Sequence, residues 1–425
     1  MGGTEVRVLA AHAGRLYAGN GYWQDRPGFE GLQGAQILAL DGPGARWRVD
    51  HAFDEWLPDG RRRDLAVSAL DEITFATDGN GARLLQSVSM LIAANWDLSG
   101  TSRVFSRDDA TGAWAAATLA QDRPTRSFLP QVRSFGQHRD RVTRVDHVFA
   151  GQDPRGIFSG TYDPAVAGRI RWSVTPELDL SGVSSAGLSG PSGYLRVSSF
   201  AKCDGHLYAA VGQHIYERID GAQPHWRLTY TNRNPGHSET GLRGLTAIPN
   251  PSGQGEVLLV AVEGNAARIV RVDPRGGSEV TELDVVGFLG QRWGMPVGYV
   301  IAAYNDMAKA LDPGGGETLL IGLEAFIPPR AQIAAGHSVV NVGYGRLEAG
   351  GWYLVRHPTA HYDLNQVVTP TGQALVAIRA IRVSPFLQEP GVIYFAGYDA
   401  NKAPANNTAW IYRSTSEATI GGRSN

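Results

Sequence analysis

Five arginines stand at equivalent places in short apolar segments, where their side chains could bind an anion. The segments 6–9, 132–135, 195–198, 242–245 and 381–384 carry Arg7, Arg133, Arg196, Arg243 and Arg382. A guanidinium binds a carboxylate or sulfate through two parallel hydrogen bonds. If the segments surround one axis, the arginines form a cationic ring for an acidic ligand. A belt of internal ion pairs with acidic residues of neighbouring strands would give the same sequence pattern, so both interpretations stay open.

Three aspartates could supply acid and base for a glycoside hydrolase. Asp25, Asp97 and Asp399 each follow or lie within an aromatic or glycine-rich loop. Two carboxylates on either side of a glycosidic bond are the usual machinery for its hydrolysis. Aspartates that cap loops are also common, so this assignment competes with a structural one.

A second constellation suits elimination from a uronic acid. Arg243 would neutralise the sugar carboxylate, and His237 or Tyr22 would remove the adjacent proton. A solvated loop histidine is the alternative for His237.

Polar and aromatic residues near the same strand ends could bind a sugar. Flat rings cover the face of a pyranose, and amides or amines bind its hydroxyls. The candidates are Trp23, Trp96, Asn20, Asn95 and Lys402. Long excursions at residues 20–34 and 324–351 favour a pocket there.

Calcium is the one metal for which the sequence offers ligands. Glu263, Asn265 and Glu324 carry the hard oxygen ligands that calcium prefers. No zinc motif, phosphate loop or dinucleotide motif occurs in the sequence.

The elements that must position these residues are short strands in a repeat. Each unit has an apolar inner strand, a second strand ending in small residues, a third strand before a turn, and often a fourth strand introduced by tryptophan. Seven such units in 425 residues give about 61 residues each, close to the longer propeller repeats. With 53 glycines and no long helical period, the chain is predicted to be all-β.

The predicted architecture is therefore a single domain over 1–425, a seven-bladed β-propeller of four-stranded antiparallel blades around a central channel. The predicted blades are 1–56, 64–120, 130–180, 193–232, 240–286, 296–369 and 374–416. The turn at Ser106, Asp108, Gly112 and Trp114 resembles the Asp box of sialidase-type propellers in a degenerate form. The resemblance implies the fold and no catalytic residue.

Composition limits the partners. A net charge of −2 argues against a nucleic-acid surface, and no apolar run is long enough for a membrane helix. We expect a monomer that binds an anionic small-molecule or oligosaccharide ligand. The single cysteine does not settle the compartment; a periplasmic or secreted protein whose signal peptide has been removed is one option.

Three functions remain open from the sequence. The leading hypothesis is a carbohydrate-active enzyme, a polysaccharide lyase or glycoside hydrolase, that cleaves an acidic glycan containing uronic acid. The alternatives are a non-catalytic propeller that binds glycan or protein, and a calcium-dependent lactonase-like hydrolase.

Overall fold

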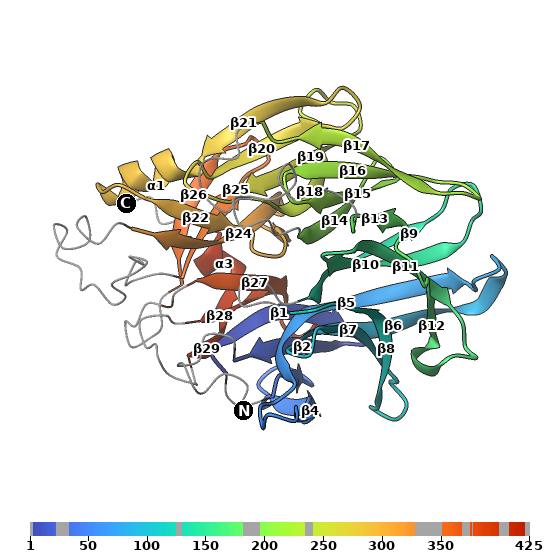
Figure 1. Ribbon diagram of the computed structural model, residues 1–425. Helices are drawn as coiled ribbons and strands as arrows, with labels where there is room; N and C mark the ends of the chain where they lie inside the picture. The colour runs from blue at the N-terminus through green and yellow to red at the C-terminus, as the bar shows by residue number, and fades with distance from the viewer. Residues whose placement is uncertain are drawn as a thin grey trace.

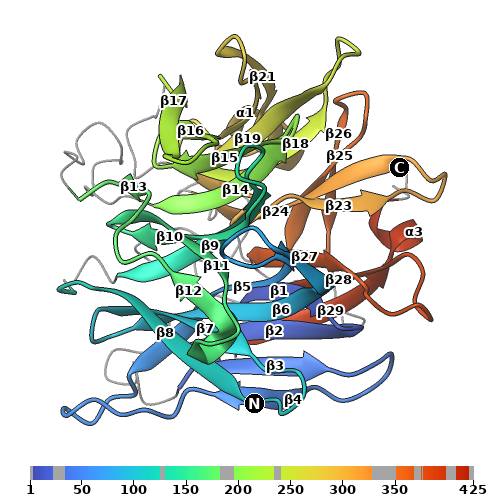
Figure 2. The same ribbon diagram turned by 90° about the vertical axis from the view of Figure 1, so that its right-hand side faces the viewer.

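The computed structural model describes most of the chain as antiparallel sheets. The described residues are 3–22, 34–124, 130–181, 196–233, 241–327, 351–367, 375, 377–398 and 408–420. Figure 1 shows the sheets following one another around a common centre, and Figure 2 shows the same arrangement from the side.

The strands fall into groups of neighbours in the chain, from the innermost strand outward. The first groups are β1 (Glu5–His12), β2 (Arg15–Gly21), β3 (Gln36–Leu40) and β4 (Arg48–Ala52); β5 (Asp64–Thr77), β6 (Arg83–Asp97), β7 (Thr101–Arg107) and β8 (Trp114–Gln121); β9 (Gln131–Arg139), β10 (Asp146–Asp153), β11 (Gly156–Tyr162), β12 (Ile170–Trp172) and β13 (Leu178–Asp179). The later groups are β14 (Val197–Cys203), β15 (His206–Val211), β16 (His214–Ile219) and β17 (His225–Thr231); β18 (Leu242–Pro249), β19 (Glu256–Val262), β20 (Arg268–Asp273) and β21 (Ser278–Asp284); β22 (Tyr299–Ala302), β23 (Ala308–Leu311), β24 (Glu317–Phe326), β25 (Trp352–Arg356) and β26 (Tyr362–Gln366); β27 (Ile378–Val383), β28 (Val392–Tyr398) and β29 (Ala409–Thr415).

Tight turns explain why these segments pair locally. Between β1 and β2, Ala13 and Gly14 adopt φ of 49° and 72°, and His12 pairs with Arg15 on either side of them. Two successive residues with positive φ give a turn whose twist matches that of the strands.

The hydrophobic core lies between consecutive groups. One cluster joins β18–β21 to β22–β26 through Leu259, Ile321 and their neighbours. Another joins the first group to the last, with Leu16 and Leu38 packed against Tyr394 and Ala396. The hydroxyl of Thr408 also donates to the carbonyl of Thr4 at 2.8 Å. The sheets therefore close into a ring, which confirms the predicted all-β propeller.

The last group has three strands among the described residues, β27–β29, so the count of seven four-stranded blades stays a prediction. The sequence analysis also missed a short helix, α1 (Val285–Trp293). It begins at Asp284, whose carboxylate accepts from the amide of Gly287, and ends at Gly294 with φ of 65°. Within the described part of the chain, no helix combines the length and apolar character needed to cross a bilayer.

Bulges in the innermost strands determine which side chains turn toward the centre. The pairing register skips one residue at Arg7 in β1, at Arg133 in β9, at Ser198 in β14 and at Arg379 in β27. A bulge redirects a side chain out of the ladder. An arginine therefore occupies the bulge in β1, β9 and β27, whereas in β14 the bulge residue is Ser198 and the predicted Arg196 lies two residues before it.

The innermost strand of the sixth group is interrupted at the corresponding place. Both β22 and β23 pair with β24, with Ala302 opposite Leu323 and Ala308 opposite Leu320. The residues between them, 303–307, are called the channel segment below. This segment carries Tyr304, Asn305 and Asp306 toward the other innermost strands.

Candidate functional site

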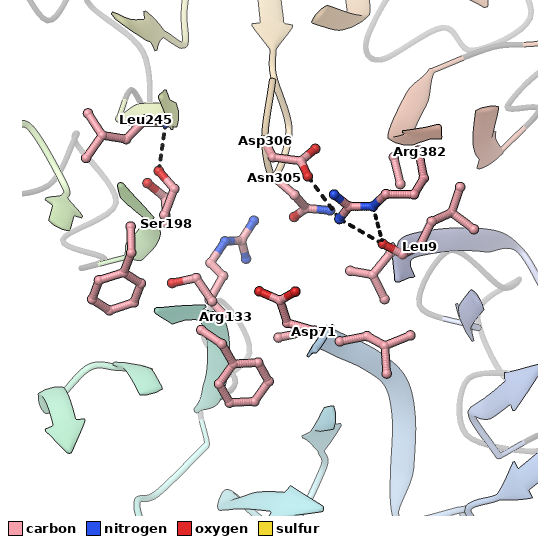
Figure 3. A pocket seen from close by; sticks show the side chains of 16 residues that line it. Leu9, Asp71, Arg133, Ser198, Leu245, Asn305, Asp306 and Arg382 are labelled. Carbon is pink, nitrogen blue, oxygen red and sulfur yellow. Dashed lines mark hydrogen bonds and ion pairs between the residues drawn. The ribbon is translucent and has the colours of Figure 1, made fainter. Parts of the chain in front are cut away.

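A cavity of about 150 Å³ lies at the centre of the ring. Its lining comes from β1, β5, β9, β14, β18, β27 and the channel segment, so the innermost strands surround one shared space, called the central channel below. Apolar side chains such as Phe135, Phe200 and Leu245 form part of the wall, and charged groups face the same space. Figure 3 shows Arg133 of β9 and Asp71 of β5 extending into it from neighbouring innermost strands.

Arg133 is the cationic group of this cavity that has no hydrogen-bonded or ion-paired partner among the described residues. It forms no hydrogen bond or ion pair with any residue that the structure describes, although its side chain is only 7% exposed. One carboxylate that interacts with Arg133 electrostatically is that of Asp153, one oxygen of which accepts from the amide of Val197 at 2.9 Å. Burial raises the pKa of Asp153 to about 6, although Arg133 opposes the shift. Burying a guanidinium without a bonded counter-ion costs free energy. Binding of an anionic ligand to Arg133 would offset that cost.

Asp71 provides a titratable acid beside Arg133. Asp71 is exposed and lines the cavity, and one of its carboxylate oxygens accepts from the amide of Glu72 at 2.9 Å. The surrounding protein raises the pKa of Asp71 to about 6; Arg382 opposes this shift and Asp306 adds to it. A carboxyl group that titrates near neutral pH can donate or accept a proton during a reaction.

Arg382 is held in place by the protein. Its guanidinium lies 3.2 Å from the Asp306 carboxylate and donates twice to the carbonyl of Leu9, at 3.1 and 2.9 Å. The sequence analysis aligned Arg382 with the other four arginines, and this alignment was wrong. Arg379, three residues earlier, occupies the bulge that matches Arg7 and Arg133. The apolar run of β27 contains two arginines, and only the register separates them.

Further along the channel, four guanidinium groups surround Tyr304. The guanidinium carbon of Arg379 lies 4.0 Å from the centre of the Tyr304 ring, and those of Arg243, Arg133 and Arg7 lie at 4.8, 5.4 and 5.7 Å. Arg7 also donates to the phenol oxygen at 3.0 Å. Burial alone would raise the pKa of this phenol, but Arg7, Arg133 and Arg379 outweigh it and lower the pKa to about 7.

The other channel arginines belong to a buried belt of ion pairs. Arg7 and Arg379 lie 3.1 and 3.3 Å from Glu5, and Arg379 lies 2.7 Å from Glu324. Arg243 pairs with Glu263, which lies 3.5 Å from Arg196. Burial opposes ionisation of Glu263, yet Arg243 and Arg196 lower its pKa to about 2.

Ion pairs within the protein account for most of the predicted arginine ring, and binding of a ligand by these arginines stays a prediction. Arg7, Arg196 and Arg243 are joined to carboxylates. Arg133 alone among the five predicted arginines has no such bond within the described residues.

Several predicted sugar ligands are engaged within the protein. Asn20 accepts from the amide of Gln36 at 2.7 Å, Asn95 donates to Asp64, and both side chains are buried. Tyr22 is also buried. Trp96 lies beside the belt, with the Arg7 guanidinium 4.9 Å from its ring.

Asp97 has a structural environment. It is fully buried and accepts from Arg63 and from the amide of Ser99, each at 2.7 Å. Because a substrate cannot reach this buried carboxylate in the described structure, Asp97 has no role in the function proposed below.

The predicted calcium ligands are not gathered. Glu263 accepts from Tyr299 and Glu324 from Tyr398, in addition to their arginines, while Asn265 is exposed. Within the described ranges, no three His, Cys, Asp or Glu side chains meet in a way that could hold a metal ion.

Five predicted site residues lie outside the described residues. They are Trp23, Asp25, His237, Asp399 and Lys402, and their assignments stay predictions. Conversely, the sequence analysis missed Asp71, Tyr304 and Arg379. One available signal was the Asp71–Glu72 pair inside a long apolar strand, since a charged pair there needs a polar neighbour.

Comparison with known proteins gives structural similarity only. No protein-family model matches the chain, and no curated protein matches it. Among solved structures, the β-propeller domain of Cps50 (Swd1) from Myceliophteria thermophila is 11% identical, with a TM-score of 0.46, and the alignment covers 98% of this chain and 99% of that one.

Two other similar structures have different described roles. The periplasmic gluconolactonase PpgL of Pseudomonas aeruginosa is 14% identical, with a TM-score of 0.40, over 77% of this chain and 82% of that one. An Aleuria aurantia lectin mutant in complex with a fucosylated GlcNAc is 10% identical, with a TM-score of 0.38, over 87% of this chain and 96% of that one. These similarities carry no argument about a ligand or a reaction here.

Proposed function

We propose that this protein is a carbohydrate-active enzyme whose substrate is an acidic sugar, bound through its carboxylate to Arg133 in the central channel. The observation that carries the proposal is the buried guanidinium of Arg133, which has no bonded partner among the described residues and faces a cavity. Guanidinium forks bind carboxylates strongly when water is largely excluded.

The size of the cavity limits the substrate. A volume of 150 Å³ corresponds to about five water molecules, well below the ~300–1,000 Å³ of sites for larger ligands. We therefore propose that a single uronate unit, free or at the end of a chain, enters the cavity. Phe135 and Phe200 offer apolar surface to a sugar ring, and Asp71 offers a group for proton transfer.

The test is calorimetric titration of the purified protein with glucuronate and galacturonate, with glucose as the neutral control. We expect the uronates to bind and glucose to fail. Arg133→Gln should weaken uronate binding about ten- to hundredfold, the loss expected for one charged hydrogen-bonding group. Arg171→Gln is the matched control, since Arg171 is a surface arginine paired with Asp163.

Uronate binding that equals glucose binding, or that survives in Arg133→Gln, would overturn the proposal. A parallel assay on uronate-containing oligosaccharides, with and without a chelator, measures new reducing ends and the ultraviolet absorbance of unsaturated products. Binding without turnover would favour the non-catalytic alternative, and activity lost on chelation would favour the lactonase-like one.

A further inference from the structure

The channel segment places one phenol in a setting unlike that of the other tyrosines near the channel. Tyr299 and Tyr398 each donate to a glutamate, Glu263 and Glu324. Tyr304 instead accepts at its hydroxyl from Arg7 at 3.0 Å. An acceptor role toward a cation favours the ionised phenolate, whereas donation to a carboxylate favours the neutral phenol.

Charged groups reach Tyr304 from four innermost strands. β1 supplies Arg7 and Glu5, β9 supplies Arg133, β18 supplies Arg243, and β27 supplies Arg379. Glu5 opposes ionisation of the phenol, but it is shared by Arg7 and Arg379. Glu263 and Glu324 likewise neutralise Arg243 and Arg379. Arg133 is thus the cation near Tyr304 whose charge no bonded carboxylate offsets among the described groups.

The backbone of the channel segment is fixed, so the phenol is positioned rather than loosely tethered. The carbonyl of Tyr304 accepts from Arg243 at 2.9 Å, and the side-chain amide of Asn305 donates to the carbonyls of Arg7 and Arg379 at 2.6 and 3.3 Å. These contacts tie the segment to three innermost strands. The four arginines are buried, whereas Tyr304 remains partly exposed.

Arg133 connects this phenol with the cavity. Its guanidinium lines the cavity and lies 5.4 Å from the centre of the Tyr304 ring. Tyr304 itself does not line the cavity, but Asn305 and Asp306 beside it in the chain do, so a carboxylate bound to Arg133 would share that guanidinium with the phenol. Arginine also stabilises the negative charge that develops on a carboxylate when the adjacent carbon loses its proton.

We infer that Tyr304 is the catalytic base of an elimination reaction on the uronate, removing the proton from the carbon that carries the carboxylate held by Arg133. This inference rests on the proposed function. In the step, the phenolate oxygen takes the C5 proton, the C–H electron pair forms the C4–C5 double bond, and the C4–O bond breaks. The leaving oxygen takes a proton from water. For a uronate joined through O4 to a neighbouring sugar, the products are an unsaturated uronate and a sugar with a free hydroxyl, and from a free uronate the same step releases water.

Two readouts test the inference separately from the proposed function. The first is the near-ultraviolet absorbance of phenolate, followed by pH titration without ligand. One tyrosine should ionise near pH 7 in the wild type, in keeping with the pKa of about 7 for Tyr304, and this step should be absent in Tyr304→Phe. Tyr299→Phe is the matched control and should keep the step, because Tyr299 is a neutral donor to Glu263.

The second readout is turnover. Tyr304→Phe should still bind uronate but form unsaturated product about a hundredfold or more slowly, the loss expected for a general base. Wild-type turnover should rise with pH through about 7 as the phenol ionises.

Absence of a tyrosine titrating near neutral pH, or unimpaired elimination by Tyr304→Phe, would overturn the inference while leaving Arg133-dependent binding intact. Failure of uronate to bind the wild type would instead remove the proposed function itself.

Discussion

At the scale of single residues, the channel combines balanced and unbalanced charges. Glu5, Glu263 and Glu324 are each paired with arginine. Arg133 and Asp71 are not paired with each other in the described structure, although both face the cavity. An incoming anion would gain the attraction of Arg133 and encounter the repulsion of Asp71 when that carboxyl is ionised. Affinity for a uronate should therefore depend on the protonation of Asp71.

The sign of this pH dependence follows from the raised pKa of Asp71, about 6. Above that pH the carboxylate repels the ligand, and below it the neutral acid does not. Wild-type affinity for glucuronate should rise as pH falls from about 7.5 to about 5, by roughly tenfold for one nearby charge. Asp71→Asn should bind tightly at both pH values.

Calorimetry at the two pH values checks this expectation. Asp163→Asn, a change at a surface carboxylate, serves as the control and should behave like the wild type. An equally strong pH dependence in Asp71→Asn would mean that another group controls binding.

At the scale of elements, arginines on third strands join adjacent groups. Arg107 of β7 lies 2.9 Å from Asp50 of β4, Arg218 of β16 lies 2.7 Å from Glu177 beside β13, and Arg356 of β25 lies 2.7 Å from Glu282 of β21. Each pair links the third strand of one group to the outer part of the preceding group. These contacts complement the apolar clusters between the sheets.

Arg218 is the most heavily engaged of these three. Its fully buried guanidinium also lies 2.9 Å from Asp140 and 2.6 Å from Asp220. Arg218→Met should lower the free energy of unfolding by about 3–5 kcal/mol, because it leaves buried carboxylates without their cation.

Urea unfolding followed by tryptophan fluorescence measures the effect. Arg171→Met should cost less than about 1 kcal/mol, since its partner contact is on the surface. Equal stability of the two variants would show that the buried network adds nothing at this interface.

Also at the scale of elements, the sequence predicted the strands and their convergence, but not the whole site. Periodic apolar residues and turn glycines are local signals, so segments such as 6–9 and 132–135 were recognised as innermost strands. The distinction between Arg379 and Arg382 depends on a bulge, and the position of Tyr304 depends on an interrupted strand. The bulge and the interruption each depend on how a strand pairs with another strand, and the sequence of a single segment does not determine that pairing.

At the scale of the whole molecule, closure of the ring determines whether the channel exists. The first and last groups meet through the cluster around Leu16 and Tyr394 and through the bond from Thr408 to Thr4. Arg379 of β27 and Glu5 of β1 pair across the same junction. The candidate site thus depends on contacts between the two ends of the described chain.

Leu16→Ala tests this dependence, since Leu16 is fully buried at the junction. We expect a loss of about 2–5 kcal/mol and faster amide hydrogen exchange in β1, β2 and β27–β29. Leu259 is equally buried between the fifth and sixth groups. Leu259→Ala should therefore raise the rate of amide hydrogen exchange in β18–β24 instead. A uniform change across all strands in both variants would mean that the ring opens only as one unit.

The interrupted innermost strand has a consequence for redesign. The strands on either side of the channel segment, β22 and β23, both pair with β24. Between Ala303 and Ala308, the segment itself has no residue paired with β24. Its chemistry is therefore separable from the scaffold, in the way that a hypervariable loop is separable from an antibody framework. A library that varies residues 304 and 306, and keeps Asn305 because its amide bonds to β1 and β27, would sample new substrate preferences while β22 and β23 keep their pairing with β24.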